Sequence, residues 1–292
     1  MNIELKNSIN NFAKRGSRWF SELAGTISSL FRIAVLSSLK VANKTHHYVE
    51  LSGGDNCMLL ANGPSLKDAF QNGVGSFENT DIFCVNSFCE SEYFWATRPS
   101  FYFLVDGAFF NPFDERTNKQ VAKLVSALSK VDWKMNLAIP SYYSPDKLIS
   151  QISNDNISVL RFNTTKVAGY KWFRNFCYKH YLGMPVCMNV TIFAVMAAVW
   201  MGYKKVVLHG LELGMFTTLS VDQDNVLCYE DSHVYDTNKT TFKRYGRSLA
   251  EELQGFVDCF NSHKEINRYA KINGCQILNA TKGSFVDAYE RV

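Results

Sequence analysis

The spacing of apolar side chains changes its period along this chain. In residues 1–44 they recur every three or four positions, which is the period of an amphipathic helix. From residue 56 onward, short apolar runs alternate with longer stretches of helical period. Strands that alternate with helices indicate a mostly parallel sheet covered on both faces, so the predicted class is α/β with a doubly wound, Rossmann-like sheet.

The same pattern predicts the individual elements. The apolar runs predict strands at 57–61, 82–85, 101–105, 137–139, 159–162, 206–208 and 276–279. The stretches of helical period predict helices at 65–71, 119–129, 146–153, 171–181, 189–201, 240–261 and 263–273. Residues 213–245 are polar and irregular and too long for an ordinary connection, so we expect a lid or substrate loop there.

Charge separates the N-terminal segment from the rest of the chain. Residues 1–44 hold seven Lys or Arg against two acids, a net +5, and since the whole chain carries +4 the remainder carries −1. The body therefore lacks the basic surface of a nucleic-acid binder. We expect a basic amphipathic helix within 1–50 and a single domain over 51–292. With Trp19 and Phe20, such a helix suits an anionic membrane surface, and docking on its own domain or on a second subunit in a homo-oligomer is equally compatible.

The eight cysteines favour a reducing location. None forms C-x-x-C and no zinc-ligand spacing occurs. Several lie in apolar runs, where a reduced thiol acts as a small hydrophobe. No leader with a compact apolar core and no run of about 18 apolar residues is visible. The expected place is the cytoplasm, peripheral on the inner face of the membrane.

A polar turn, Asn62-Gly63-Pro64-Ser65, separates the first buried strand from its helix. Gly63 lets a ligand approach the backbone, Pro64 sets the turn, and Ser65 suits the helix N-cap. Ligands of open parallel sheets bind at the carboxyl ends of strands, where free amides and the helix dipole favour an anion. The turn therefore predicts an anion site, with an ordinary capped turn as the alternative. It matches neither G-x-G-x-x-G nor a P-loop.

Two further strands end in small polar residues. Asn86 and Ser87 end the second predicted strand, and Asp106 ends the third. The carboxyl ends of neighbouring parallel strands lie at one edge of the sheet, so we expect these side chains to converge on one crevice with the first turn.

Three motifs resemble the bacterial CMP-sialic-acid-dependent sialyltransferases of glycosyltransferase family 42. They are LLANGPSLKD at 59–68, CVNSF at 84–88, and VLHGLEL at 207–213 after MGYKK. The resemblance covers roughly residues 56–235 and implies a GT-A-like transferase domain. The N-G-P-S-L turn also resembles a wider group of 6-hydroxymethylpterin-diphosphokinase-like domains, as does NATKGSFVDAYER at 279–291.

The resemblance also implies a donor site, with departures from the family pattern. Ser87 stands where the family has Gln, and Asp106 where it has Asn. The R-x-T-S-G segment of the family is replaced by VCMNVTIF, so its Arg is missing and Asn189 and Thr191 would take over the polar contacts. The implied nucleotide- and donor-binding residues are Asn62, Gly63, Pro64, Ser65, Asn86, Ser87, Asp106, Asn189, Thr191, Gly210 and Glu212.

Transfer of an acidic sugar needs a base for the acceptor hydroxyl and donors for the departing phosphate. His titrates near neutral pH, which suits the base. His233 lies in the polar segment YEDSHVYD, where the family has a similar S-H-Y stretch, so it is the expected base. Tyr229 and Tyr235 flank it and would hydrogen-bond the phosphate. His263 opens the last predicted helix and is expected to be a cap or surface residue.

The resemblance implies an inverting transferase that uses a CMP-activated acidic sugar, such as sialic acid or Kdo, and a glycan or lipid-linked acceptor. Glu212 could position the sugar, or it could cap a helix. The carboxylates are scattered without D-x-D spacing, so we expect no obligatory cofactor; Mg²⁺ could bind near Glu230 but is not required. Two alternatives stay open: an ATP- and Mg²⁺-dependent pterin-type diphosphokinase, and a non-catalytic membrane-associated scaffold.

Overall fold

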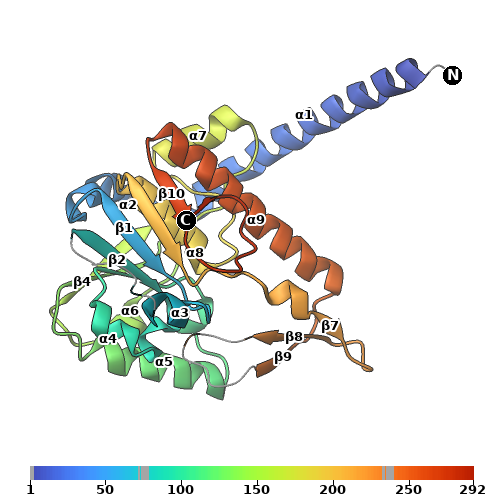
Figure 1. Cartoon of the computed structure of the whole chain (residues 1–292). Helices are drawn as coiled ribbons and strands as arrows, with labels where there is room; N and C mark the ends of the chain where they lie inside the picture. The colour runs from blue at the N-terminus through green and yellow to red at the C-terminus, as the bar shows by residue number, and fades with distance from the viewer. Residues whose placement is uncertain (1–2, 72, 74–78, 232–233, 235–239) are drawn as a thin grey trace.

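An eight-stranded sheet forms the centre of the molecule in the computed structural model, which describes residues 3–71, 73, 79–231, 234 and 240–292 (Figure 1). The spatial order is β11-β10-β6-β1-β2-β3-β4-β5, and every pairing is parallel. The strands are β1 (Asn56–Leu60), β2 (Thr80–Val85), β3 (Phe101–Phe103), β4 (Met135–Pro140), β5 (Ile157–Phe162), β6 (Lys205–His209), β10 (Gln276–Asn279) and β11 (Glu290–Arg291). The predicted α/β fold with a doubly wound parallel sheet is confirmed.

The strand order reverses at β1. From β1 the chain adds β2, β3, β4 and β5 on one side, then returns to place β6 on the other side of β1. The connections after β1 and β6 therefore run to opposite faces of the sheet and leave a crevice between them. Such a switch point at the carboxyl ends of the strands is where open α/β sheets bind ligands.

Helices cover both faces of the sheet, because the strands bury apolar side chains on both sides. One core contains Leu59 and Phe83 packed under α7 (Lys171–Lys179), α8 (Val190–Trp200) and α9 (Leu249–Ile272). The other contains Leu60 and Cys84. Its helices are α3 (Leu66–Gln71), α4 (Tyr93–Thr97), α5 (Glu115–Leu128) and α6 (Asp146–Ile149), with the 3₁₀ turns η2 (Asn86–Glu90) and η3 (Gly107–Phe109).

The sequence predicted an irregular loop over residues 213–245, but the structure differs. This segment contains the turn η4 (Met215–Thr218) and a separate antiparallel sheet of β7 (Ser220–Val221), β8 (Leu227–Asp231) and β9 (Thr240–Arg244). Asp222 closes the turn between β7 and β8, since its carboxylate accepts from the amides of Asp224 and Val226. Cross-strand pairing stabilises this polar segment, which carried too weak an apolar pattern to predict strands.

The last helix also differs from prediction. Residues 240–261 and 263–273 do not form two helices. The first residues of this stretch form β9, and α9 then runs unbroken for 24 residues from Leu249. A capping box sets its start, because the Ser248 side chain accepts from the Glu251 amide while the Glu251 carboxylate accepts from the Ser248 amide.

The N-terminal segment comprises α1 (Ile3–Leu36), which projects away from the sheet, followed by α2 (Leu39–Thr45) and the turn η1 (His46–Leu51) (Figure 1). Among the described residues, no single helix has the length and apolar character to cross a bilayer. One bent pair, residues 16–36 with 39–51 at 91°, meets that test by length and composition only.

Candidate functional site

A cavity of about 420 Å³ lies at the switch point, at the carboxyl ends of β1, β2 and β6. Chain segments far apart in sequence form its walls. The sequence-predicted residues that line it are Asn62, Gly63, Pro64, Asn86, Asn189, Thr191, Gly210 and Glu212. Asn62 and Asn86, whose positions at neighbouring strand ends predict that they face one crevice, line the same cavity.

The turn after β1 is closed by protein partners rather than left open for an anion. The Gly63 amide donates to the Gly210 carbonyl at 2.9 Å, and the Ser65 amide donates to Glu212 Oε1 at 2.7 Å. A Cβ on Gly63 would lie 1.4 Å from Glu212 Oε2, so only glycine fits beside this carboxylate. Glu212 thus occupies the Ser65 amide and would oppose a second anion there, and the expected phosphate contact at this turn stays a prediction.

The same wall presents buried hydrogen-bond acceptors. Within the described residues, Asn62 Oδ1, Asn86 Oδ1 and Glu212 Oε2 are buried without a hydrogen-bond partner. Asn62 is oriented by its Nδ2, which donates to the Val85 carbonyl at 3.2 Å. A buried acceptor without a partner carries a desolvation cost of about 1–3 kcal/mol. This wall is therefore suited to a ligand that brings hydroxyl or amino groups.

Asn86 adopts a conformation that a neighbouring ring holds in place. Its φ of 46° is in the left-handed region, which Asn tolerates better than most residues. The Tyr102 hydroxyl donates to the Asn86 carbonyl and accepts from the Cys89 amide. Burial raises the pKa of Tyr102 well above its usual value, so the hydroxyl stays a donor.

The opposite wall is the start of α8. Asn189 is its N-cap, and its Oδ1 accepts from the Ile192 amide at 3.1 Å and from Thr191 Oγ1 at 2.8 Å. Val190 and Thr191, in the first turn, line the cavity. Every residue of this eleven-residue helix is buried, so its dipole is surrounded by apolar protein. The positive end of the dipole faces the cavity. An anionic group suits this wall.

Several predicted residues have other local roles. Ser87 is buried and accepts from Gln120 Nε2 at 2.7 Å, and Asp106 caps η3 through the Ala108 amide. Ser65 begins α3 through its carbonyl, which accepts from the Ala69 amide. These three residues do not line the cavity. Ser65 and Ser87 come after Asn62 and Asn86, which form the cavity edge, and Asp106 follows β3, one strand farther away.

The predicted catalytic residues are only partly within the described chain. His233 and Tyr235 lie outside the described residues. Tyr229 is buried in β8, with its ring stacked on Phe242 and the Arg244 guanidinium 5.4 Å from its centre; the cavity wall contains its neighbour Glu230 instead. Side chains alternate along a strand, so Tyr229 and Glu230 face opposite ways.

A second cavity, of about 170 Å³, continues from the first and shares Asn189, Leu213 and Met215 with it. Arg244 and Arg247 also line this cavity, and Arg247 Nε lies 2.8 Å from Glu252 Oε2. Sequence reasoning missed both arginines, because they stand in the stretch predicted as loop and helix, and only β9 and the capped start of α9 place them here.

Two histidines lie away from the cavity wall, His263 buried and His209 half-buried. Burial lowers the pKa of His209, at the end of β6. His263 was expected to be a cap or surface residue, which is wrong: it is fully buried within α9, and its Nδ1 lies 2.8 Å from the Tyr289 hydroxyl. Burial lowers its pKa to about 3. Among the described residues, no three His, Cys, Asp or Glu side chains form a cluster that could hold a metal ion.

The similarity of this chain to known proteins is distant. No protein-family model and no curated protein matches the chain. Among solved structures, the MAf glycosyltransferase from Magnetospirillum magneticum AMB-1 is similar at a TM-score of 0.48 and 11% identity, over 86% of this chain and 38% of that one. The chain thus spans little more than a third of that protein. Fold and cavity together define an α/β protein with a cavity at the switch point of its sheet.

Proposed function

We propose that the protein is a glycosyltransferase that moves an acidic sugar from a CMP-sugar to a glycan or lipid-linked acceptor. The observation that carries the proposal is the switch-point cavity, which has buried acceptors on one wall and a helix N-terminus on the other. A nucleotide has the matching polarity, with hydroxyl and amino groups at one end and a phosphate at the other. The motif resemblance to sialyltransferases supplies the CMP-sugar class.

In this proposal the nucleoside lies against Asn62, Asn86 and Glu212. The Glu212 carboxylate accepts hydrogen bonds from the ribose hydroxyls, as acidic residues do in other nucleotide-binding α/β folds. The phosphate lies at the start of α8, near Thr191. This arrangement differs from the one expected at the N-G-P-S turn, since Glu212 makes that turn electronegative.

The arginines of the adjoining cavity support an acidic sugar. Arg244 and Arg247 lie where a group attached to the phosphate would extend past Asn189. A guanidinium is well matched to a carboxylate because it offers two parallel donors. The positive charge missing from the α8 segment is thus supplied by β9 and the connection to α9.

In the reaction, the acceptor oxygen bonds to the anomeric carbon while the bond from that carbon to the phosphate oxygen breaks, and CMP leaves with inverted configuration at the sugar. His233 takes the acceptor proton, and Tyr235 is proposed to assist the phosphate, whereas Tyr229 faces away from the cavity in β8. The support for His233 is its sequence neighbour Val234, whose amide donates to the Asn62 carbonyl at 2.7 Å.

The decisive experiment measures ligand binding before turnover. Calorimetry with CMP, cytidine and ATP with Mg²⁺ is expected to show that CMP binds best, and that Asn86→Ala and Glu212→Ala weaken it at least tenfold. Asn261→Ala, an exposed change on α9, is the matched control and should bind normally. Release of CMP from CMP-sialic acid or CMP-Kdo then identifies the donor, and His233→Ala should abolish it.

Other results would favour the alternatives. Tight binding of ATP with Mg²⁺ and indifference to CMP would support a diphosphokinase. If neither CMP-sugar binds at millimolar concentration, the donor assignment is wrong. If both bind but neither wild type nor His233→Ala releases CMP, the chain is better described as a scaffold that keeps the fold without the chemistry.

A further inference from the structure

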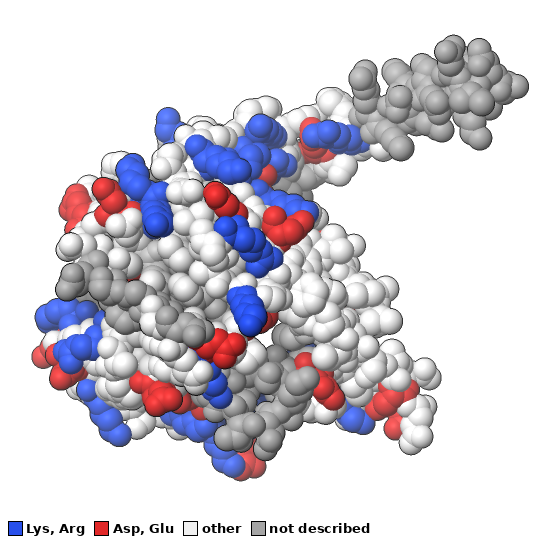
Figure 2. Space-filling view, viewed as in Figure 1, with Lys and Arg blue, Asp and Glu red and all other residues white. Residues whose placement is uncertain are grey.

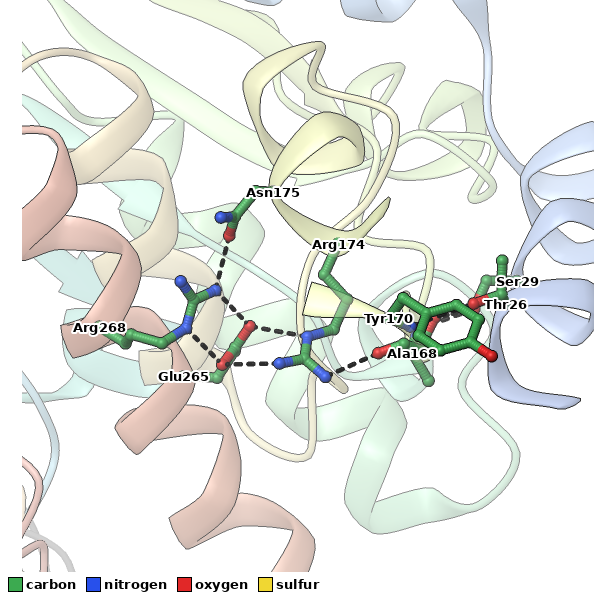
Figure 3. A network of polar contacts seen from close by, with 9 residues as sticks. Thr26, Ser29, Ala168, Tyr170, Arg174, Asn175, Glu265 and Arg268 are labelled. Carbon is green, nitrogen blue, oxygen red and sulfur yellow. Dashed lines mark hydrogen bonds and ion pairs between the residues drawn. The ribbon is translucent and has the colours of Figure 1, made fainter. Parts of the chain in front are cut away.

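The helix α1 is attached to the body by its small polar side chains. Ser29 Oγ accepts from the Ala168 amide at 2.8 Å and donates to the Ala168 carbonyl at 3.1 Å, and Thr26 Oγ1 accepts from the Tyr170 amide at 3.1 Å (Figure 3). Gly25 lets the two backbones approach, since a Cβ there would lie 2.9 Å from the Gly169 amide nitrogen.

A charged network behind this contact holds the docking loop. Arg174 donates to the Gly169 carbonyl at 2.8 Å and to Glu265 at 2.9 Å, and Arg268 donates to the same carboxylate at 2.6 Å (Figure 3). Burial alone would raise the pKa of Glu265, but the two guanidiniums keep it below its usual value. The orientation of α1 is therefore set by contacts that reach α7 and α9.

This docking turns the apolar side of α1 outward. Phe20, Ile27, Phe31 and Val35 are four to seven residues apart, so they share one side of the helix, and they are exposed at 65%, 60%, 72% and 63%. An ordinary surface helix buries such a stripe against its domain. Here the polar stripe is buried and the apolar stripe is uncovered.

Exposed aromatic rings continue this surface onto α7. Trp19 lies on α1, and its carbonyl accepts from the Tyr170 hydroxyl at 3.5 Å. The Tyr170 ring stacks on Trp172, which is 68% exposed. Tryptophan and tyrosine are the side chains enriched where a protein meets the headgroup layer of a bilayer.

The segment that carries the apolar side is basic. Residues 16–45 contain four Lys or Arg, namely Arg18, Arg32, Lys40 and Lys44, against one acid, Glu22, which pairs with Arg18 at 3.1 Å. Figure 2 shows Lys and Arg side chains around the base of α1. A second copy of this chain would bring the same positive charges against these, whereas an anionic lipid surface complements them.

We propose that α1 lies in the headgroup layer of an anionic bilayer, with Phe20, Ile27, Phe31 and Val35 inserted toward the acyl chains and the basic residues at the phosphates. We define this surface as the α1 apolar face. The inference stands apart from the proposed function, since it uses neither the cavity nor a donor. It also gives the body a fixed orientation on the membrane, because the polar network ties α1 to α7 and α9.

The test is co-sedimentation of the full chain with vesicles of phosphatidylcholine alone and with added phosphatidylglycerol. Wild type should bind the anionic vesicles, more weakly as salt rises. Phe20→Ser with Phe31→Ser should weaken binding at least about tenfold. Phe113→Ser is the matched control, because Phe113 is 79% exposed and precedes α5 in the chain, and its loss should change nothing. Helix α5 lies on the other side of the molecule from α1 (Figure 1).

Two results would overturn the proposal. One is equal vesicle binding by wild type and the double variant. The other is no vesicle binding together with a dimer, seen by light scattering, that the double variant loses; a second copy would then cover the face. Calorimetry with CMP on the double variant keeps this test separate from the proposed function, since CMP affinity should be unchanged whichever result is obtained.

Discussion

Gly63 and Glu212 lie against each other at the cavity wall, although 149 positions separate them in sequence. Sequence reasoning selected both residues, but as independent parts of a donor site. Only the fold shows that the carboxylate lies on the glycine and accepts from the Ser65 amide. Residue types at strand ends can be read from sequence, whereas the charge that a second segment brings to them cannot.

Gly63→Ala should disrupt this turn. The new Cβ would lie 1.4 Å from Glu212 Oε2 and 2.4 Å from the Gly210 carbonyl oxygen, so carboxylate and backbone must both move. We expect a loss of about 1–3 kcal/mol in the free energy of unfolding, measured with urea, and weaker CMP binding. Gly54→Ala is the control, because its nearest neighbour would be 3.5 Å away. Equal stability of the two variants would contradict the geometry.

His263 should make stability depend on pH. Its pKa is about 3 when folded and about 6.5 when unfolded, so between these values the unfolded chain binds the extra proton. Its contribution is therefore complete above pH 6.5 and is lost as the pH falls. We expect urea unfolding to show that wild type loses about 2 kcal/mol more than His263→Asn between pH 6.5 and 5. Parallel pH profiles for the two proteins would refute the assignment.

At the scale of elements, local pattern predicted most strands of the main sheet to within a few residues. The strand at 276–279 was predicted with the bounds that β10 has. The prediction failed where pairing between strands, rather than local pattern, determines the structure. An example is β8 and β9, which have polar sequences and are stabilised by each other. For α1, periodicity predicted an amphipathic helix but not that its polar side would be the one docked on the body.

Gly25→Ala should loosen α1. Alanine favours a helix over glycine by about 1 kcal/mol, but at position 25 its Cβ would meet the Gly169 backbone at 2.9 Å. Gly16→Ala gains the same propensity with nothing within 4 Å, so it is the matched control. We expect the α1 segment to be cleaved faster in Gly25→Ala than in wild type, and at the wild-type rate in Gly16→Ala. Equal protection of both variants would show that α1 does not need this close contact.

At the scale of the whole molecule, non-covalent contacts stabilise the fold, without disulfide bonds between the described cysteines. All eight cysteines are described and free, and most are buried. Burial raises the pKa of Cys57 and Cys84 well above the usual value and that of Cys187 to about 12. Thiolates are therefore scarce in the folded protein.

We expect the thermal midpoint to be the same with and without a reducing agent. A thiol-specific reagent should label the native protein slowly and all eight cysteines quickly after denaturation. Rapid labelling of several thiols in the native state, or a midpoint that falls on reduction, would mean that the core is more open than the structure shows.

The sequence by itself determined the α/β class, the place of the polar turn after the first strand, and the amphipathic character of the N-terminal helix. These follow from local periodicity and turn chemistry, which act between near neighbours. Tertiary structure decided that Glu212 closes the turn, that Arg244 and Arg247 line an adjoining cavity, and that the apolar side of α1 faces outward. Each of these depends on contacts between distant segments, whose pairing is set by packing of the whole sheet rather than by the pattern within any one segment.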